Sequence, residues 1–334
     1  MSDVADISVV ICTRNRGASL QETLSCLAAA DRSGLRVEVV IVDNGGEDAT
    51  RQVADEFYKE LNTRYLLEPV LGKYGKSHAL NRALDEGNLG EIVAILDDDM
   101  SPAPGWFQGV AESRRRWPDA DIFGGRTHII WPMAEPPRWC LDPAVTDSIF
   151  SAADRGGEYK ELAPGSTFSG NHFWFRSRVL ADGHRFADIW LTEPDFMLSI
   201  TESGGKGYWA PAAVAGHRVQ PGLMDKMVAK KRAVFTGRST GELRLLPHRH
   251  NPKVEQFRRH PFLCQCLFAG KFLRWSWTYG TSRLSLDSDK AFASSLRALS
   301  RLSAYQEMLK LSKSARASHS SRSTGPLPEV ASRS

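Results

Sequence analysis

Short apolar runs alternate with amphipathic segments along the N-terminal part of the chain, which predicts strands connected by helices. The apolar runs are rich in Val and Ile, as is typical of strands buried on both faces of a parallel sheet. They occupy residues 7–12, 37–42, 64–67 and 92–96. Apolar residues recur at helical spacing between them, over residues 20–30, 50–61 and 77–87. This repetition predicts an α/β fold with a Rossmann-like, mainly parallel central sheet flanked by helices.

The pattern changes further along the chain. Prolines and tryptophans crowd residues 102–143, which favours loops and short strands. The next predicted elements are a strand entering a helix at 168–180, a helix at 193–203 and a strand at 209–214. Predicted helices then follow at 224–234, 262–273 and 288–311. We therefore expect a sheet-containing domain (1–224), a basic helical extension (225–311) and a Ser- and Arg-rich disordered tail (312–334).

Composition restricts the class of protein. With 42% hydrophobic and 25% charged residues, the chain is typical of soluble globular proteins, which excludes wholesale disorder and collagen-like structure. The longest stretch without a charged residue covers 162–175, which is shorter than the roughly 18 residues expected of a membrane-spanning helix. The acidic N-terminus does not resemble a signal peptide, and the five cysteines are scattered without CxxC spacing. These features predict a cytoplasmic location.

Charge is distributed unevenly. Residues 225–334 hold 21 Lys and Arg against 7 Asp and Glu, a balance of +14, although the whole chain carries only +4. Residues 1–224 therefore carry −10. A basic C-terminal region fits an anionic partner such as a lipid headgroup, an acidic glycan or a nucleic acid. A solvated helical surface is an equally good interpretation.

Three adjacent carboxylates follow the last buried strand of the N-terminal half. Asp97, Asp98 and Asp99 come directly after the strand at 92–96. Ligands of open α/β sheets bind outside the carboxyl ends of the strands, so a site is expected here. Like charges this close repel unless a cation compensates them, which favours a divalent metal held by carboxylates and substrate phosphates. The alternative is an acidic loop that faces solvent.

Other polar side chains also occur at predicted strand ends. Carboxylates and amides can bind a base or ribose, whereas Lys and Arg offset phosphate charge. The residues concerned are Thr13, Arg14, Asn15, Asp43, Lys76 and Asn81. Taken singly each is more typical of a turn, and only their shared placement favours a site. Neither GxGxxG after the first strand nor GxxxxGK[ST] anywhere is present, so a dinucleotide fold or a P-loop is not supported.

These segments resemble the successive signatures of glycosyltransferase family 2. The matching sequences are ISVVICTRNR (7–16), VDNGGEDAT (42–50), GKSHALN (75–81), LDDDMSPAPGW (96–106), FSGNHFWFR (168–176) and TEPDFML (192–198). They occur in the family's order, and the resemblance covers about two-thirds of the chain. It implies an inverting enzyme of the glycosyltransferase A fold that uses a nucleotide-activated sugar. Residues 1–224 would then form the transferase domain.

The resemblance also implies roles for individual residues on the donor side. Asp43 would contact the nucleobase with Arg14 and Asn15 nearby, and Lys76 and Asn81 would line the nucleotide pocket. Asp97 and Asp99 match the family's Asp-x-Asp pair, with Asp99 as the direct ligand of Mn²⁺ or Mg²⁺ and Asp97 nearer the ribose. His217 matches a histidine that meets the metal or diphosphate. Thr13 and Asp98 complete the implied donor-binding set, whereas Gly170, Asn171 and Trp174 belong to the acceptor-side segment.

The catalytic base is expected at the start of the helix that follows Thr192. The family carries an adjacent Glu-Asp pair there, whereas Pro194 separates Glu193 from Asp195 in this chain. Thr192 can cap the helix, and a proline is tolerated in its first turn. We favour Asp195 as the base and Glu193 as a partner that orients the acceptor, while the exchanged assignment remains open.

The resulting expectation is transfer of a sugar, with inversion, from a nucleoside diphosphate sugar to a hydroxyl of a glycan or lipid-linked acceptor. Uridine and thymidine are the bases that the resemblance favours. Peripheral contact with the inner face of an anionic membrane is an expected partner interaction, and nucleic acid is not. Two alternatives remain: a nucleotidyltransferase on a related fold, and a non-catalytic module that binds sugar nucleotides or glycans.

Overall fold

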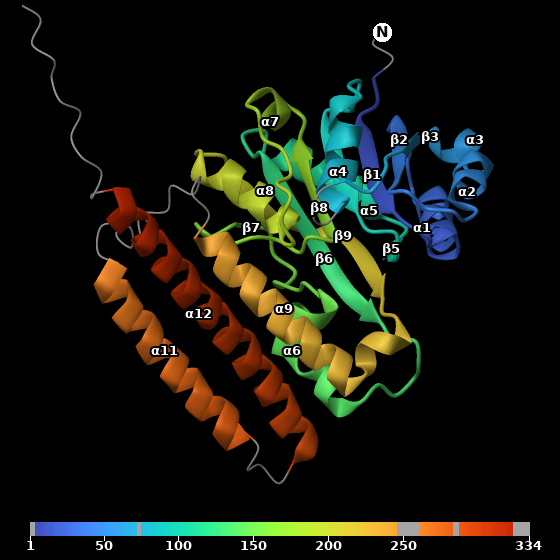
Figure 1. Cartoon of the computed structure of the whole chain (residues 1–334). Helices are drawn as coiled ribbons and strands as arrows, with labels where there is room; N and C mark the ends of the chain where they lie inside the picture. The colour runs from blue at the N-terminus through green and yellow to red at the C-terminus, as the bar shows by residue number, and fades with distance from the viewer. Residues whose placement is uncertain (1–3, 72–74, 246–260, 283–286, 323–334) are drawn as a thin grey trace, which may run out of the picture. The chain divides into compact units, whose positions relative to one another are not determined.

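The computed structural model describes residues 4–71, 75–245, 261–282 and 287–322. The chain divides into two compact units, residues 1–229 and 230–334. The boundary lies inside α9 (Lys226–Arg244) rather than at residue 224, where the sequence pattern predicts it. Figure 1 shows the strands in the first unit and long helices in the second.

The first unit is built on one nine-stranded sheet. In spatial order its strands are β3 (Thr63–Leu67), β2 (Val37–Asp43), β1 (Ile7–Thr13), β4 (Ile92–Leu96), β8 (His172–Arg176), β6 (Ile122–Ile130), β9 (Gly207–Arg218) and β5 (Met100–Pro102), and β7 (Lys160–Glu161) pairs with β9. β1, β2, β3 and β4 are parallel neighbours. β8 is antiparallel to both β4 and β6, so β6 and its parallel partner β9 run in the direction of β4. The predicted mainly parallel sheet is confirmed, with β5, β7 and β8 running the opposite way.

Helices cover both faces of this sheet. Those of the first unit are α1 (Gly17–Ala29), α2 (Thr50–Glu56), α3 (Tyr58–Leu61), α4 (Lys76–Asp85), α5 (Trp106–Arg116), α6 (Pro143–Phe150), α7 (Arg178–Ala181) and α8 (Thr192–Glu202), with 3₁₀ turns at Arg138–Leu141 and Pro221–Met224. Alternate residues of β1 point to opposite sides: Val9 joins the core formed with α1 and α5, whereas Val10 joins the core formed with α4 and α8. The predicted α/β class is therefore confirmed.

Several predicted elements have different bounds. α5 and β6 span eleven and nine residues within 102–143, so the expectation of loops and short strands is wrong there. The helix expected at 50–61 is interrupted at Phe57, whose amide donates to Asp55 O and whose ring packs on the core. α12 (Ser288–Arg322) continues through the first half of the expected disordered tail, because residues 288–322 contain neither glycine nor proline to end the helix. The helix thus extends to Arg322 in the structure, and residues 323–334 of the expected tail lie outside the described residues.

The second unit contains most of α9, α11 (Pro261–Ser282) and α12, so the expected helical extension is present. Gly237 and Gly241 of α9 lie directly against the backbone of α12 at Ser300 and Ala304, and α11 packs on α12 as well. α12 is thus packed between the other two helices, as Figure 1 shows. No helix within the described ranges has both the length and the apolarity required to cross a membrane.

The close approach of α9 and α12 predicts that Gly237→Ala destabilises the protein. The added methyl group would overlap Ser300 O, and overpacking of this kind costs about 1–3 kcal/mol, more than alanine gains over glycine in helix propensity. Gly270→Ala on α11 is the matched control, because no atom lies within 4 Å of the position its β-carbon would take. Thermal and urea unfolding should show loss of stability for Gly237→Ala alone; equal stability of the two variants would contradict the close packing.

Candidate active site

The carboxyl ends of β1, β2 and β4 bring the predicted site residues together at one end of the sheet. β1 ends at Thr13, which pairs with Asp43 at the end of β2. β4 ends at Leu96, directly before the three carboxylates. β5 then pairs with β9 so that Met100 lies opposite His217. The first unit therefore collects side chains from distant parts of the sequence around Asp97–Asp99.

Asp98 is an anchor of this loop. Its side chain is 3% exposed; Oδ2 accepts a hydrogen bond of 2.6 Å from Thr13 Oγ1, and Oδ1 lies 2.6 Å from Arg16 Nη1. Burial raises the pKa of Asp98 to about 6, although Arg16 and Thr13 stabilise the carboxylate. Both oxygens of Asp98 are thus used to hold the end of β1 against the loop.

Asp99 faces His217. Asp99 Oδ2 lies 2.8 Å from Arg16 Nη2 and 3.5 Å from His217 Nε2, while Oδ1 is buried with no hydrogen-bond partner among the described residues. His217 Nδ1 donates to Phe150 O over 2.6 Å, which directs Nε2 toward the carboxylate. Burial opposes both charges, but His217 and Arg16 hold the pKa of Asp99 well below its usual range, and Asp99 raises the pKa of His217.

Lys76 connects the carboxylate loop to α8. Its ammonium lies 2.8 Å from Asp97 Oδ1 and 2.5 Å from Glu193 Oε1. Burial opposes its charge, but Asp97 and Glu193 raise the pKa of Lys76 well above its usual value. The first residues of α8 are therefore held beside the end of β4 by one cation.

Glu193 and Asp195 are both buried, at 7% and 3% exposure, but they do not face the same way. Side chains two residues apart on a helix diverge, and Glu193 is the one that meets Lys76. A β-carbon added at Gly170 would lie 3.2 Å from Glu193 Cβ, so the predicted acceptor-side segment also borders Glu193. Asn171 O accepts from Asp97 N, which ties that segment to the carboxylate loop.

The residues expected near a nucleobase lie around the ends of β1 and β2. Asp43 is 2% exposed and accepts hydrogen bonds from Gly46 N (2.7 Å) and Tyr65 Oη (2.9 Å). Arg14 and Asn15 are exposed beside it, and Asn15 Oδ1 accepts from Glu47 N. Asp43 therefore shapes the loop that follows β2.

Two predicted site residues have structural partners instead. The amide of Asn81 donates to Phe186 O and accepts from Phe186 N, each over 2.9 Å, so it fixes the segment before α8. Trp174 is fully buried, and its Nε1 donates to Ser113 Oγ of α5. Strand alternation directs Trp174 into the core on the side of α5.

Two arginines that the candidate set omitted organise the site. Arg16 forms an ion pair with each of Asp98 and Asp99. Arg218 donates from Nη2 to Asp98 O (3.2 Å) and Thr23 Oγ1 (2.8 Å), and from Nη1 to Met100 O (2.6 Å). The only sequence signal was their position: Arg16 follows the TRN segment after β1, and Arg218 is adjacent to His217.

The potential metal ligands around Asp99 suit a divalent ion only if a substrate supplies further ligand atoms. Within the described residues no group of three or more His, Cys, Asp or Glu side chains is arranged to hold a metal. Mg²⁺, however, is commonly bound by one or two carboxylates together with substrate phosphates. The unpaired Asp99 Oδ1 and the oriented His217 Nε2 fit such a shared site.

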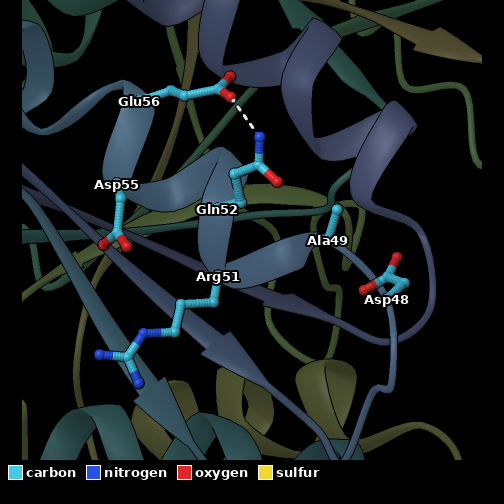
Figure 2. A pocket seen from close by; sticks show the side chains of 6 residues that line it. All are labelled: Asp48, Ala49, Arg51, Gln52, Asp55 and Glu56. Atoms are coloured by element: carbon cyan, nitrogen blue, oxygen red, sulfur yellow. Dashed lines mark hydrogen bonds between the residues drawn. The ribbon is translucent and has the colours of Figure 1, made fainter.

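Two surface cavities lie outside this cluster. One, of about 730 Å³, lies over α2 and is lined by Asp48, Ala49, Arg51, Gln52, Asp55 and Glu56. Figure 2 shows that its side chains come from a single helix and its N-terminal approach, with Gln52 donating to Glu56. The other, of about 460 Å³, is lined by residues 126–129 of β6 together with Trp131, Leu141, Thr146, Ala152, Asp154 and Val214. Neither cavity is lined by a predicted site residue.

The sheet order and the carboxylate loop after β4 agree with the glycosyltransferase A fold that the sequence resemblance implies. The family model "Glycosyl transferase family 2" matches residues 8–180, and the chain belongs to this family.

Relatives are similar over part of their length. Glycosyltransferase AglE of Haloferax volcanii is 30% identical over 128 residues, which cover 38% of this chain and 40% of AglE. The N-acetylglucosaminyl-diphospho-decaprenol L-rhamnosyltransferase of Mycobacterium tuberculosis is 28% identical over 174 residues, 49% of this chain and 51% of that protein. The chain thus spans about half or less of these relatives.

A similar solved structure is that of mannosyltransferase PcManGT from Pyrobaculum calidifontis, in complex with GDP-Man and Mn²⁺. The TM-score is 0.51 at 20% identity, and the match covers 98% of this chain and 78% of PcManGT. This likeness confirms the fold.

The double ion pair of Arg16 predicts that Arg16→Gln destabilises the metal-free protein. The change leaves the buried Asp98 carboxylate without its cation and Asp99 with His217 alone, a loss of about 1–3 kcal/mol. Arg14→Gln, at an exposed neighbour, is the control and should change stability by less than about 0.5 kcal/mol. Mn²⁺ should raise the melting temperature of Arg16→Gln more than that of the unmodified chain; equal melting temperatures in EDTA would refute the role of Arg16.

Proposed function

We propose that this chain transfers a sugar from a nucleoside diphosphate sugar to an acceptor hydroxyl, with inversion at the anomeric carbon. The observation that carries the proposal is the Asp97–Lys76–Glu193 contact, because it sets a carboxylate of α8 beside the Asp-x-Asp loop. Inversion requires a general base on the face opposite the leaving diphosphate. The Glu193 carboxylate, which shares Lys76 with Asp97, can act as that base. Residues 1–224 would supply the whole transferase domain.

The donor would bind across the ends of β1, β2 and β4. Asp43 and the neighbouring Arg14 and Asn15 border the position proposed for the nucleobase. Asp97 borders the position proposed for the ribose. Lys76 would offset phosphate charge once Asp97 is engaged by the donor. We propose uridine or thymidine as the base; the GDP-Man of PcManGT supports a nucleotide-sugar donor in general.

Asp99 and His217 would hold Mn²⁺ or Mg²⁺ together with the diphosphate. When bound, the ion supplies positive charge where the diphosphate leaves. The chain's own contribution is to orient the two ligands: Phe150 O fixes the His217 ring, and Arg16 holds Asp99. The Mn²⁺ in the PcManGT complex supports this cofactor class.

Glu193 is the better candidate for the base than Asp195. The contact of Glu193 with Lys76 keeps its carboxylate next to the carboxylate loop and beside Gly170. We therefore propose that Glu193 is the general base and that Asp195 supports the start of α8, which reverses the assignment favoured from the sequence. Asp195 N donates to Leu191 O within this first turn.

A glycan or lipid-linked acceptor remains part of the proposal. The name of the mycobacterial rhamnosyltransferase specifies a polyprenyl-diphosphate-linked sugar, which supports the lipid-linked class. Membership of family 2 counts against a nucleotidyltransferase, and measured turnover of donor to nucleoside diphosphate would separate an enzyme from a sugar-binding module. A cytoplasmic location stays a prediction from the scattered cysteines.

Metal dependence follows from the Asp99–His217 pair. EDTA should abolish turnover and Mn²⁺ or Mg²⁺ should restore it, and Asp99→Asn should lose metal-dependent donor binding with a drop in turnover of roughly a hundredfold or more. Asp55→Asn, at an exposed carboxylate on α2, is the control that should retain both properties. Donor-induced thermal shifts with and without Mn²⁺ measure the binding. Full activity in EDTA would overturn the metal assignment.

The base assignment predicts opposite behaviour for two isosteric changes. Glu193→Gln should lose roughly 10²–10⁴-fold in turnover, because general-base catalysis is worth that much, while retaining most donor affinity. Asp195→Asn should keep near-normal turnover if it folds, which the melting temperature checks. An active Glu193→Gln beside an inactive, folded Asp195→Asn would return the role of base to Asp195.

A further inference from the structure

α11 presents large apolar side chains to solvent. Leu273 is 67% exposed and Trp277 is 76% exposed, and their spacing of four residues puts them on the same side of the helix. Arg274 is exposed next to Leu273. We call Leu273, Arg274 and Trp277 the α11 face. Exposed clusters of this kind mark interaction sites, because leaving Trp and Leu in water is unfavourable.

The other side of α11 is already used within its own unit. α11 packs along α12, and the Lys271 ammonium lies 5.8 Å from the centroid of the Tyr305 ring of that helix. α12 in turn packs against α9 at Gly237 and Gly241. Inside the described part of this three-helix unit, therefore, the α11 face is not covered by α12 or α9.

The charge of the helix narrows the choice of partner. α11 contains no acidic residue and two basic ones: Arg274, which belongs to the α11 face, and Lys271, which lies on the side toward α12. It belongs to the region of residues 225–334 whose balance is +14. A partner must therefore accept both apolar side chains and positive charge, and an anionic lipid surface does both: Trp is suited to the boundary between headgroups and acyl chains, and Arg pairs with lipid phosphate.

We propose that the α11 face lies on the surface of an anionic bilayer, with Leu273 and Trp277 inserted among the headgroups and Arg274 paired with lipid phosphate. The helix would lie on the membrane rather than cross it, in line with the hydropathy of the described helices. This surface is separate from the carboxylate loop and its test uses neither donor nor acceptor. A failure here therefore leaves the proposed reaction untouched, and the reverse also holds.

The test is sedimentation of the full chain with vesicles of phosphatidylcholine alone or mixed with phosphatidylglycerol. We expect binding to the mixed vesicles at low salt, and strong loss of binding at about 0.5 M NaCl, where the Debye length is roughly 4 Å. Leu273→Ala combined with Trp277→Ala should weaken binding by about tenfold or more. Arg274→Gln should weaken it roughly fivefold, since one cation near the surface contributes on that scale.

Matched controls lie in the first unit. Tyr58→Ala combined with Leu67→Ala removes two side chains that are each 59% exposed, and Arg115→Gln removes one exposed arginine. Both should bind vesicles like the unmodified chain, and donor turnover without vesicles should be the same for all four variants. Absence of binding to mixed vesicles at low salt would overturn the proposal, as would equal binding by the α11 and control variants. Self-association that the α11 variants abolish without lipid would assign the face to a second copy instead.

Discussion

Mutual repulsion of three adjacent carboxylates is the constraint around which the first unit is arranged. Each is compensated by a cation from elsewhere in the chain: Asp97 by Lys76, Asp98 by Arg16, and Asp99 by Arg16 and His217. Because these cations come from α4, from the turn after β1 and from β9, neutralising the loop also fixes how those elements meet. In a site of low polarity, like charges left without such partners would not remain ionised together.

The backbone of the same loop is held as firmly as its side chains. Asp98 O accepts hydrogen bonds from Ser19 and Thr23 of α1 as well as from Arg218. Arg218 also reaches Met100 O, so one guanidinium spans the start of α1, the loop and β5. Backbone positions held from several directions keep the carboxylates oriented without reorganisation, which is the property that electrostatic catalysis requires.

Periodicity was enough to predict the buried strands of the first hundred residues and several helices, because buried strands and amphipathic helices leave distinct spacings of apolar residues. It missed β6 and α5, which lie where prolines and tryptophans favour loops. The position of the carboxylate loop could also be predicted, because acidic residues directly after an apolar strand lie at the carboxyl end of that strand. Periodicity could not assign partners. Asn81 and Trp174 are residue types often found in binding sites. In the structure, however, Asn81 hydrogen-bonds to the backbone of Phe186, and Trp174 hydrogen-bonds to Ser113 of α5. Arg16 and Arg218 lacked any signal beyond their position, because an arginine's role depends on which distant atoms it reaches.

The position of Lys76 between Asp97 and Glu193 has a consequence for the order in which ligands act. One cation shared by two carboxylates makes the two sides of the site a linked equilibrium. A ligand that draws Asp97 away leaves the whole charge of Lys76 to Glu193, and a ligand that engages Glu193 releases Lys76 toward Asp97. By thermodynamic reciprocity, whatever effect occupation of one side has on the affinity of the other acts equally in the reverse direction. The link between the two carboxylates is a single ammonium group.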